Sequence, residues 1–344
     1  DVIRSFPDNT ELEAWLTFTS NSPGGQVRSV AADPRSFTLR QRHSFVRLPD
    51  DNYQTRVADP RYGFGATSFA DYSAAMCEPM LTRYIARHRL EKVNPGRAPS
   101  RVVEPIVYYL DPGTPEPVRS ALLDGGRWWG DAFEAAGFID AYRVEMLPEG
   151  ADMMDVRYNV IQWVHRSTRG WSYGSSVVDP RTGEIMKGHV SLGSLRVRQD
   201  YLIAEGLLGP YSDSGDQPSS EALEMALARI RQLSAHEIGH TLGISHNFAS
   251  STYGRESVMD YPAPLASVSF DGEIDLSSAY DVGIGDWDKR TIEYGYGDWG
   301  ADTETVIDSL LNDSVENGLL FISDTDARPL GGAHPMAHLW DNGS

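Results

Sequence analysis

The segment HEIGHTLGISH constrains this chain more than any other, because it fixes three histidines, His236, His240 and His246, at set distances from one another. Apolar residues recur at helical spacing over 219–242, which predicts one helix there. His236 and His240 are four residues apart on it, so both imidazoles leave the same face about one turn apart. Gly243 can adopt a positive φ and end the helix, and the resulting turn brings His246 to the other two.

Three neutral histidines leave one position of a tetrahedral zinc ion open to water, as in catalytic sites, whereas structural sites close all four. Zinc lowers the pKa of bound water to roughly 7. Glu237 follows the first histidine directly and can take the proton from that water and pass it to a leaving amine. The alternative is that these are ordinary helix and loop histidines. Chance would produce the five fixed positions in a chain of this length with a probability of about 10⁻⁵. The sequence therefore predicts one catalytic zinc ion.

This segment resembles the signature H-E-x-x-H-x-x-G-x-x-H of the metzincin clan of zinc endopeptidases, in which a Met-turn follows. SVMDYP is the Met-turn candidate, with Met259 lying 13 residues after His246 as an apolar floor beneath the imidazoles. Tyr261 stands where astacin-like and serralysin-like members have a tyrosine. The resemblance implies that its hydroxyl ligates resting zinc and then stabilises the oxyanion. The alternative is a tyrosine that only packs beside the site.

Asn247 differs from the residue usual after the third histidine in the best-known branches of the clan. With DPRTGEI, IGDWDK and ARPLGGAHPMAHLWDNG, residues 45–344 look most like large bacterial secreted or envelope zinc-dependent metalloproteases known mainly through domains of unknown function. That resemblance implies a secreted or periplasmic, cell-envelope location. It also implies that the family's chain continues past Ser344 into a further helical region.

The pattern of turns and apolar runs predicts an α+β protein in three parts. Residues 1–95 alternate short β-like runs with turn sequences, which predicts a small β-rich N-terminal unit. A metzincin-like peptidase domain is expected over 96–344, with a mixed twisted β-sheet and the zinc helix in 96–246 and a mostly helical C-terminal subdomain with the Met-turn in 247–344. The role of the N-terminal unit does not follow from its sequence.

Individual elements are predicted from periodicity and turn signals. One helix is expected over 115–138, and further elements are a strand at 102–111, a hairpin at 170–193, helices at 283–296 and 303–316, and a strand at 318–323. By the order of elements in metzincins, the hairpin presents a free edge strand above the cleft. Its residues Gly174, Ser175, Ser176 and Val177 would pair with a peptide substrate. The alternative is a covered edge.

Composition limits the possible partners. With 49 acidic and 30 basic residues the formal charge is −19, which disfavours binding to nucleic acid or an anionic membrane. No apolar run is long enough to span a membrane.

The single Cys77 excludes an internal disulfide and is expected to be a small buried residue. Calcium in the turns SDSGDQ and DGEID is possible but lacks EF-hand spacing. His334 and His338 are four apart among glycine and proline, so we interpret them as structural.

Together these features predict a zinc-dependent endopeptidase that acts on peptide or protein substrates. Two alternatives stay open: a catalytically silent zinc- or peptide-binding module of a larger envelope protein, and a zinc exopeptidase or hydrolase of small amides. Intact Glu237 disfavours the first, and nothing in the sequence indicates a group that grips a substrate terminus. The natural substrate, the cleavage preference, the activation mechanism and the oligomeric state do not follow from the sequence.

Overall fold

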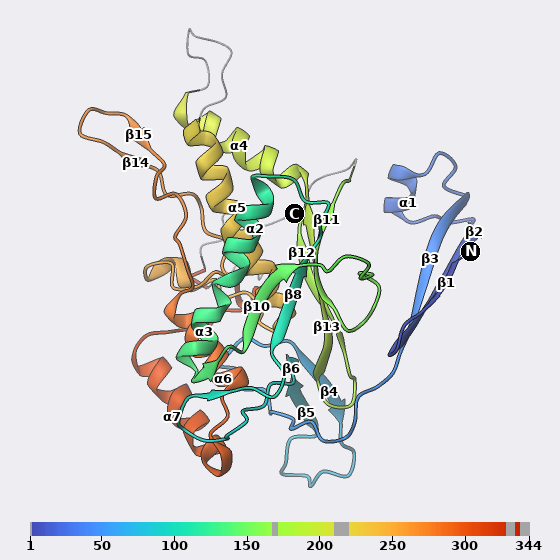
Figure 1. The fold of residues 1–344 in the computed structure, drawn as a ribbon, viewed down its shortest axis with the longest axis vertical. Coiled ribbons are helices and arrows are strands. Elements are labelled where there is room, and N and C mark those ends of the chain that lie inside the picture. The colour runs from blue at the N-terminus through green and yellow to red at the C-terminus, as the bar shows by residue number, and fades with distance from the viewer. Residues whose placement is uncertain (1, 167–170, 210–219, 328–333, 338–344) are drawn as a thin grey trace.

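A computed structural model describes residues 2–166, 171–209, 220–327 and 334–337. Its centre is a six-stranded sheet with the order β10-β8-β11-β13-β12, in which β6 also pairs with β13 (Figure 1). All pairs in it are parallel except β12 with β13, so the sheet is mixed, as predicted. The strands are β6 Arg87–His88, β8 Ile106–Leu110, β10 Tyr142–Met146, β11 Asn159–Val164, β12 Tyr173–Val178 and β13 Glu184–Gly193.

The helix that carries two of the histidines packs on this sheet. It is α5, Ser220–Thr241, and it contacts both β12 and β13, with α2 and α4 packed along it. Fifteen of its 22 residues are buried, because the sheet, the two helices and the C-terminal segments surround it. The predicted helix over 219–242 is thus confirmed, except that residue 219 lies outside the described residues. The neighbouring helices are α2 Val118–Arg127, α3 Trp129–Ala135 and α4 Leu195–Leu208.

One expectation about helices was wrong, and one helix was not predicted. The predicted single helix over 115–138 is divided into α2 and α3, with Trp128 donating its N–H to Gly125 in a tighter turn between them. Gly125 and Gly126 are weak helix formers, which favours a break at this point. The sequence also gave no prediction of α4, whose apolar residues are not concentrated on one face.

The C-terminal part is mostly helical, as predicted. Helices α6 Asp286–Tyr296 and α7 Thr303–Glu316 confirm the two expected helices, and a short helix α8 Asp324–Ala327 follows. The strand expected at 318–323 is absent from this described segment. The N–H of Ile322 bonds to the Asn247 side chain and its carbonyl accepts from Phe248, so the segment joins a loop rather than a sheet. The remaining short elements are 3-10 turns at Ser250–Thr252 and Gly300–Asp302 and strands β14 Ser267–Val268 and β15 Ile274–Asp275.

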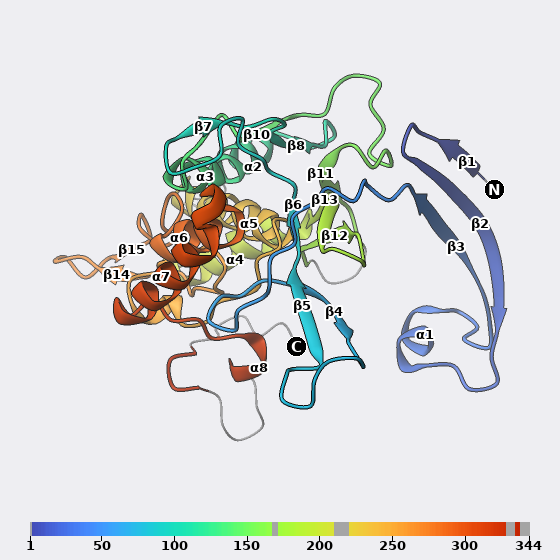
Figure 2. The same ribbon diagram turned by 90° about the horizontal axis from the view of Figure 1, so that it is seen from below.

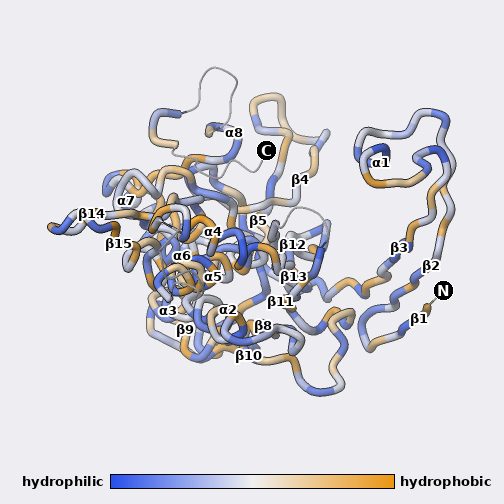
Figure 3. The backbone as a smooth tube through the Cα atoms, turned by 90° about the horizontal axis from the view of Figure 1, so that it is seen from above, coloured by the Kyte–Doolittle hydropathy of each residue, from blue (hydrophilic) through white to orange (hydrophobic). Residues whose placement is uncertain are grey.

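Residues 2–46 form a separate antiparallel sheet, which confirms the β-rich N-terminus. Strands β1, β2 and β3 extend away from the body, and their tube alternates hydrophobic and hydrophilic stretches (Figures 2 and 3). Asn9 attaches the base of this sheet to the body, because its side chain donates to the Met154 carbonyl and accepts from the Val156 N–H. The elements are β1 Val2–Ser5, β2 Asn9–Thr19, α1 Gly25–Val30 and β3 Ser36–Val46.

Residues 53–93 behave differently and pack into the main body. Tyr62, Ile85 and Leu90 belong to the same buried cluster as Trp129 and Trp287. The segment contains the hairpin of β4 Ala66–Ala70 and β5 Leu81–Ile85 and leads into β6; two short strands, β7 Ser100–Arg101 and β9 Phe138–Ile139, follow. The domain division at residue 95 therefore stays a prediction, since core contacts cross it.

Cys77 lies in the loop of the β4–β5 hairpin and is exposed, so the expectation of a buried cysteine was wrong. Among the helices that the structure describes, none combines the length and the apolar character that a membrane crossing needs.

The crossing of α2 and α5 gives a stability test. A Cβ added at Gly125 would lie 1.9 Å from the Arg231 carbonyl oxygen, whereas a Cβ at Gly130 in α3 would meet nothing within 4 Å. We expect Gly125→Ala to lower the free energy of unfolding by about 2 kcal/mol or more, because the helices must move apart. Gly130→Ala should raise it by about 0.5–1 kcal/mol through helix propensity. Urea unfolding followed by circular dichroism measures both. Wild-type stability for Gly125→Ala would contradict the tight crossing.

Candidate metal centre

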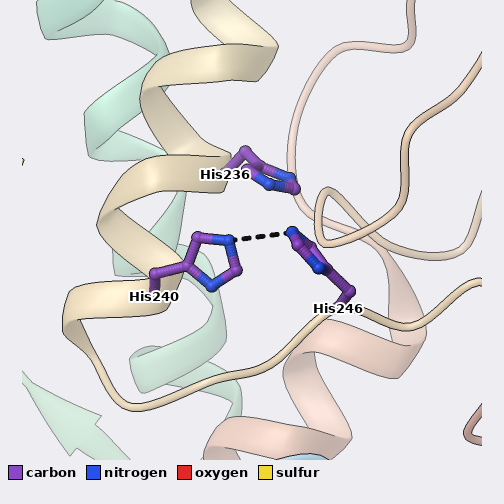
Figure 4. A group of neighbouring side chains, drawn as sticks. All are labelled: His236, His240 and His246. Carbon is purple, nitrogen blue, oxygen red and sulfur yellow. Dashed lines mark hydrogen bonds between the residues drawn. The ribbon is translucent and has the colours of Figure 1, made fainter. Parts of the chain in front are cut away.

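The three predicted histidines meet in space. His236 and His240 project from the last turns of α5, and His246 comes from the loop that follows (Figure 4). One ligand nitrogen from each lies within 4.8 Å of the others, and within the described residues this is the one such group of three or more potential ligands. The Nε2 atoms of His240 and His246 are 3.1 Å apart. Two nitrogens bound to one tetrahedral zinc ion are separated by about 3.3 Å, given Zn–N bonds of about 2.0–2.1 Å.

The other nitrogen of each imidazole is already engaged. Nδ1 of His236 lies 2.7 Å from the Val258 carbonyl, Nδ1 of His240 lies 2.8 Å from the Ile244 carbonyl, and Nδ1 of His246 lies 2.9 Å from a carboxylate oxygen of Asp324. Each acceptor requires Nδ1 to carry the proton, so the Nε2 lone pair is left for a metal. Burial also lowers the pKa of His240 to about 4 and that of His236 well below its usual value, which keeps both neutral.

The chain leaves α5 through the turn at Gly243, as predicted from its residue type. Gly243 has φ +99°, and a Cβ there would lie 1.8 Å from the Ala86 carbonyl oxygen. Segment 63–65 runs antiparallel beside this turn, with Gly65 N–H donating to the Gly243 carbonyl and Ser245 N–H donating to the Gly63 carbonyl. Residues far upstream therefore hold the loop that carries His246.

Met259 is fully buried and packs against α5 at Gly239. Its sulfur would lie 2.3 Å from a Cβ at Gly239, so the absence of a side chain at Gly239 lets the methionine approach α5. The turn before Met259 is bound by Asp288 of α6, whose carboxylate accepts from the Ser257 hydroxyl at 2.6 Å and the Val258 N–H at 2.9 Å. Burial raises the pKa of Asp288 to about 7, and these donors oppose that shift.

Glu237 lies beside the histidines and is 5% exposed. Its burial raises its pKa to about 8, against the opposing effects of the Arg229 and Arg196 charges and a hydrogen bond from the Gly174 backbone. Glu237 also lines a cleft of about 420 Å³ together with His240, His246 and Tyr261. A carboxyl group with a raised proton affinity thus faces the same space as the open sides of the imidazoles.

Tyr261 stacks beside two of the histidines. Its ring centroid is 4.6 Å from that of His246 and 5.2 Å from that of His236. A side chain in this position can both pack against the imidazoles and reach the cleft that it lines.

The edge strand β12 borders the same cleft. Tyr173, Gly174, Ser176 and Val178 line it, and Gly174 lies so close to the Glu237 carbonyl that a Cβ would be 2.2 Å from that oxygen. β12 pairs with β13 on one side, and its described partners leave the other side unpaired. Of the predicted substrate-contact residues, Gly174 and Ser176 line the cleft, whereas Ser175 and Val177 are outside its lining.

Several residues of the site were not predicted from sequence. Asp324 bonds to His246 across 78 residues, and Asp288 holds the Met-turn from α6. Gly65 and Ala86 line the cleft from the N-terminal segment. Asp288 lies in the segment IGDWDK, but the resemblance assigned it no role, and no local pattern connects Asp324, Gly65 or Ala86 with the histidines.

The other histidines and acidic turns singled out in the sequence are not part of the described histidine cluster. His334 accepts at Nδ1 from the Met336 N–H, whereas His338 and the turn SDSGDQ at 212–217 lie outside the described residues. DGEID spans the turn and second strand of the small β14–β15 hairpin. The possibility of calcium therefore stays untested.

The contact of Asp324 with His246 yields a metal-binding test. Asp324→Ala should weaken zinc affinity by about 10–100-fold, because the imidazole loses the partner that fixes its orientation. Asp326→Ala in the same helix is the matched control, since the Asp326 carboxylate accepts from Ser323 instead. Competition with a chromophoric chelator measures the affinities. Equal affinities for both variants would refute a role for Asp324 in holding the metal.

Two family models match this chain, one at each end. Residues 1–93 match a family model described as a domain of unknown function, DUF5117. Residues 218–344 match the family model DUF4953, described as Met-zincin, and this match includes the three histidines and Met259. No curated protein matches the chain. The match to the Met-zincin model over residues 218–344 and the cluster of His236, His240 and His246 within that segment agree with each other.

Proposed function

We propose that the protein is a zinc-dependent endopeptidase. The observation that carries the proposal is the convergence of three imidazoles, each with Nδ1 engaged, beside a cleft that His240, His246 and Glu237 line. The donor set fits zinc, since nitrogen ligands in neutral imidazoles with a carboxylate or carbonyl behind them suit that ion. The Met-zincin family match supports the same metal and a metallopeptidase activity.

The residues around this point have distinct proposed roles. When bound, zinc would polarise the substrate carbonyl and activate a water molecule. Glu237 takes the proton from that water and delivers it to the leaving amine, which its buried position beside His236 supports. Tyr261 donates from its hydroxyl to the oxyanion that develops on the carbonyl oxygen. Met259 supports the imidazoles from below.

The substrate class is proposed from the shape of the site. β12 offers an unpaired backbone edge along the cleft, and an extended peptide can add to such an edge as an antiparallel strand. This arrangement accepts the middle of a chain, which favours an endopeptidase over an exopeptidase. A secreted or periplasmic location is proposed on the family resemblance alone.

Glu237 provides the main test. The zinc-loaded chain should cut a mixed peptide library at internal bonds, with products read by mass spectrometry. Glu237→Gln should lower kcat/KM by about 10²–10⁴, because the variant cannot accept the proton. Glu224→Gln, on an exposed turn of the same helix, should keep full activity. A chelator should abolish cleavage. If the loaded chain binds zinc and cuts nothing, the alternative of a silent binding module is favoured.

Tyr261 provides a second test. Tyr261→Phe should lower kcat by about 10²–10³ with little change in KM, because the hydroxyl acts mainly on the transition state. Tyr253→Phe is the control, since the Tyr253 hydroxyl donates to the Leu320 carbonyl and its loss should leave kcat nearly unchanged. Steady-state kinetics on one cleaved peptide separates the two constants. An unchanged kcat for Tyr261→Phe would leave this tyrosine a packing role alone.

A further inference from the structure

The cleft has a wall that comes from outside the Met-zincin segment. Gly65 and Ala86 line the cleft together with Glu237 and His246, and both lie within the segment 1–93 that matches a different family. Gly65 bonds directly to the turn at Gly243, and Ala86 N–H donates to the Gly65 carbonyl at 2.7 Å. The strand β4 begins at the next residue, Ala66, so a strand extends outward from the wall of the cleft.

One edge of β4 is paired and the other is open. Antiparallel strands alternate between residues that bond to the partner and residues that point away from it. Gly65 and Asp71 bond to the partner strand, because the Ala86 N–H donates to the Gly65 carbonyl and the Asp71 N–H donates to the Met80 carbonyl. Within β4 the alternation then makes Thr67 and Phe69 the residues that bond to β5. The N–H and C=O groups of Ala66, Ser68 and Ala70 therefore point away from β5. These three residues are exposed, and no bond from their backbone groups to a described residue outside the hairpin is present.

The other edge of the hairpin, that of β5, is covered by segment 56–58. The open edge of the hairpin is therefore that of β4. The N–H of Ile85 donates to the Arg56 carbonyl, and the carbonyl of Arg83 accepts from the Ala58 N–H. β5 thus lies between β4 and segment 56–58. Figure 2 shows β5 leading into β6, with β4 beside β5.

The directions of the two edge strands agree. β12 starts beside the histidine cluster, with Gly174 against Glu237. It ends at Val178, which lies opposite Ile185 of β13, and Ile185 pairs with His88, two residues after Ala86. β4 starts at that same side and runs outward. A peptide antiparallel to β12 runs toward the metal, so the residues before its scissile bond lie along β12. The residues still further upstream would reach β4 and be antiparallel to it as well.

The composition of β4 suits a docking edge. Natural proteins protect bare edges with lysine, proline, bulges or a covering segment. β4 reads ATSFA and contains none of these residues, and its outward positions are alanine, serine and alanine. Small side chains leave the backbone of an edge accessible to a second chain. β12 reads YGSSVV and resembles it in this respect.

We propose that β4 is a second docking strand for the extended polypeptide substrate, and that it binds residues upstream of those held by β12. This inference rests on the proposed function for the position of the scissile bond. β12 can pair with about six substrate residues, given about 3.3 Å per residue, so β4 adds affinity only for longer chains. Because the contacts are backbone hydrogen bonds, the added affinity is independent of sequence.

The test measures peptide binding without cleavage. The full-length, zinc-loaded Glu237→Gln chain is titrated into two mixed-sequence peptide pools, of six and twelve residues, each with a C-terminal fluorescein, and the anisotropy gives Kd. The twelve-residue pool should bind at least about tenfold more tightly. A third pool, twelve residues long with alternate N-methyl groups in its N-terminal half, should lose that advantage because it cannot pair on β4.

Two variants test whether the tighter binding of the longer peptides depends on β4. Ser68→Pro removes an outward N–H but no bond to β5, and proline is tolerated on an edge strand. It should bring the two pool affinities within about twofold. Ala75→Pro, in the exposed loop of the same hairpin, is the matched control and should keep the tenfold ratio.

Two outcomes would overturn the inference: a ratio unchanged by Ser68→Pro, or N-methylated peptides that bind as well as unmodified ones. Cleavage by the parent chain is measured separately. Cleavage without any length dependence of binding would refute the docking strand and leave the endopeptidase proposal intact. A length dependence that needs Ser68, in a chain that cuts nothing, would support the docking strand and refute the endopeptidase.

Discussion

The close packing of α5 against its neighbours is the constraint on which the rest of the structure depends. Its buried surface contains polar groups as well as apolar ones, and two of them have clear partners: Ser234 donates to the Leu122 carbonyl, and Thr241 donates to the Tyr108 hydroxyl. Gly239 lets Met259 and Trp129 approach the helix, because a Cβ would lie within 2.7 Å of both side chains. A helix fixed in this way holds the imidazoles of its last turns at a defined separation.

Distant parts of the chain converge on the short region after α5. Segment 63–65 pairs with the turn at Gly243, Asp288 binds the turn before Met259, and Asp324 bonds to His246. Each contact acts on a different ligand or its support, so the metal site depends on the N-terminal and C-terminal segments together. This also explains why residues 53–93 share the core of the peptidase body although they match a different family model from residues 218–344.

The proposed cleavage of extended chains would need a long, accessible binding surface and a short, precisely arranged site. The sheet edge β12 and the strand β4 provide unpaired backbone on either side of the cleft wall, whereas the metal centre is buried against α5. Unpaired edges are prone to aggregation. Their retention next to the site is the physical reason for assigning them to substrate binding.

The sequence by itself determined the local part of this protein. The spacing of His236 and His240 follows from the helical period, and the positive φ of Gly243 follows from its lack of a Cβ, so both were predictable. Tertiary structure alone decided the rest. The prediction of a strand at 318–323 was wrong because a strand needs a neighbouring strand to bond to. Here the Ile322 N–H donates to the Asn247 side chain instead. Asp324 contacts His246 from about 80 residues further along the chain, and segment 63–65 contacts the turn at Gly243 from about 180 residues before it. Periodicity in a sequence does not predict pairing between such distant positions.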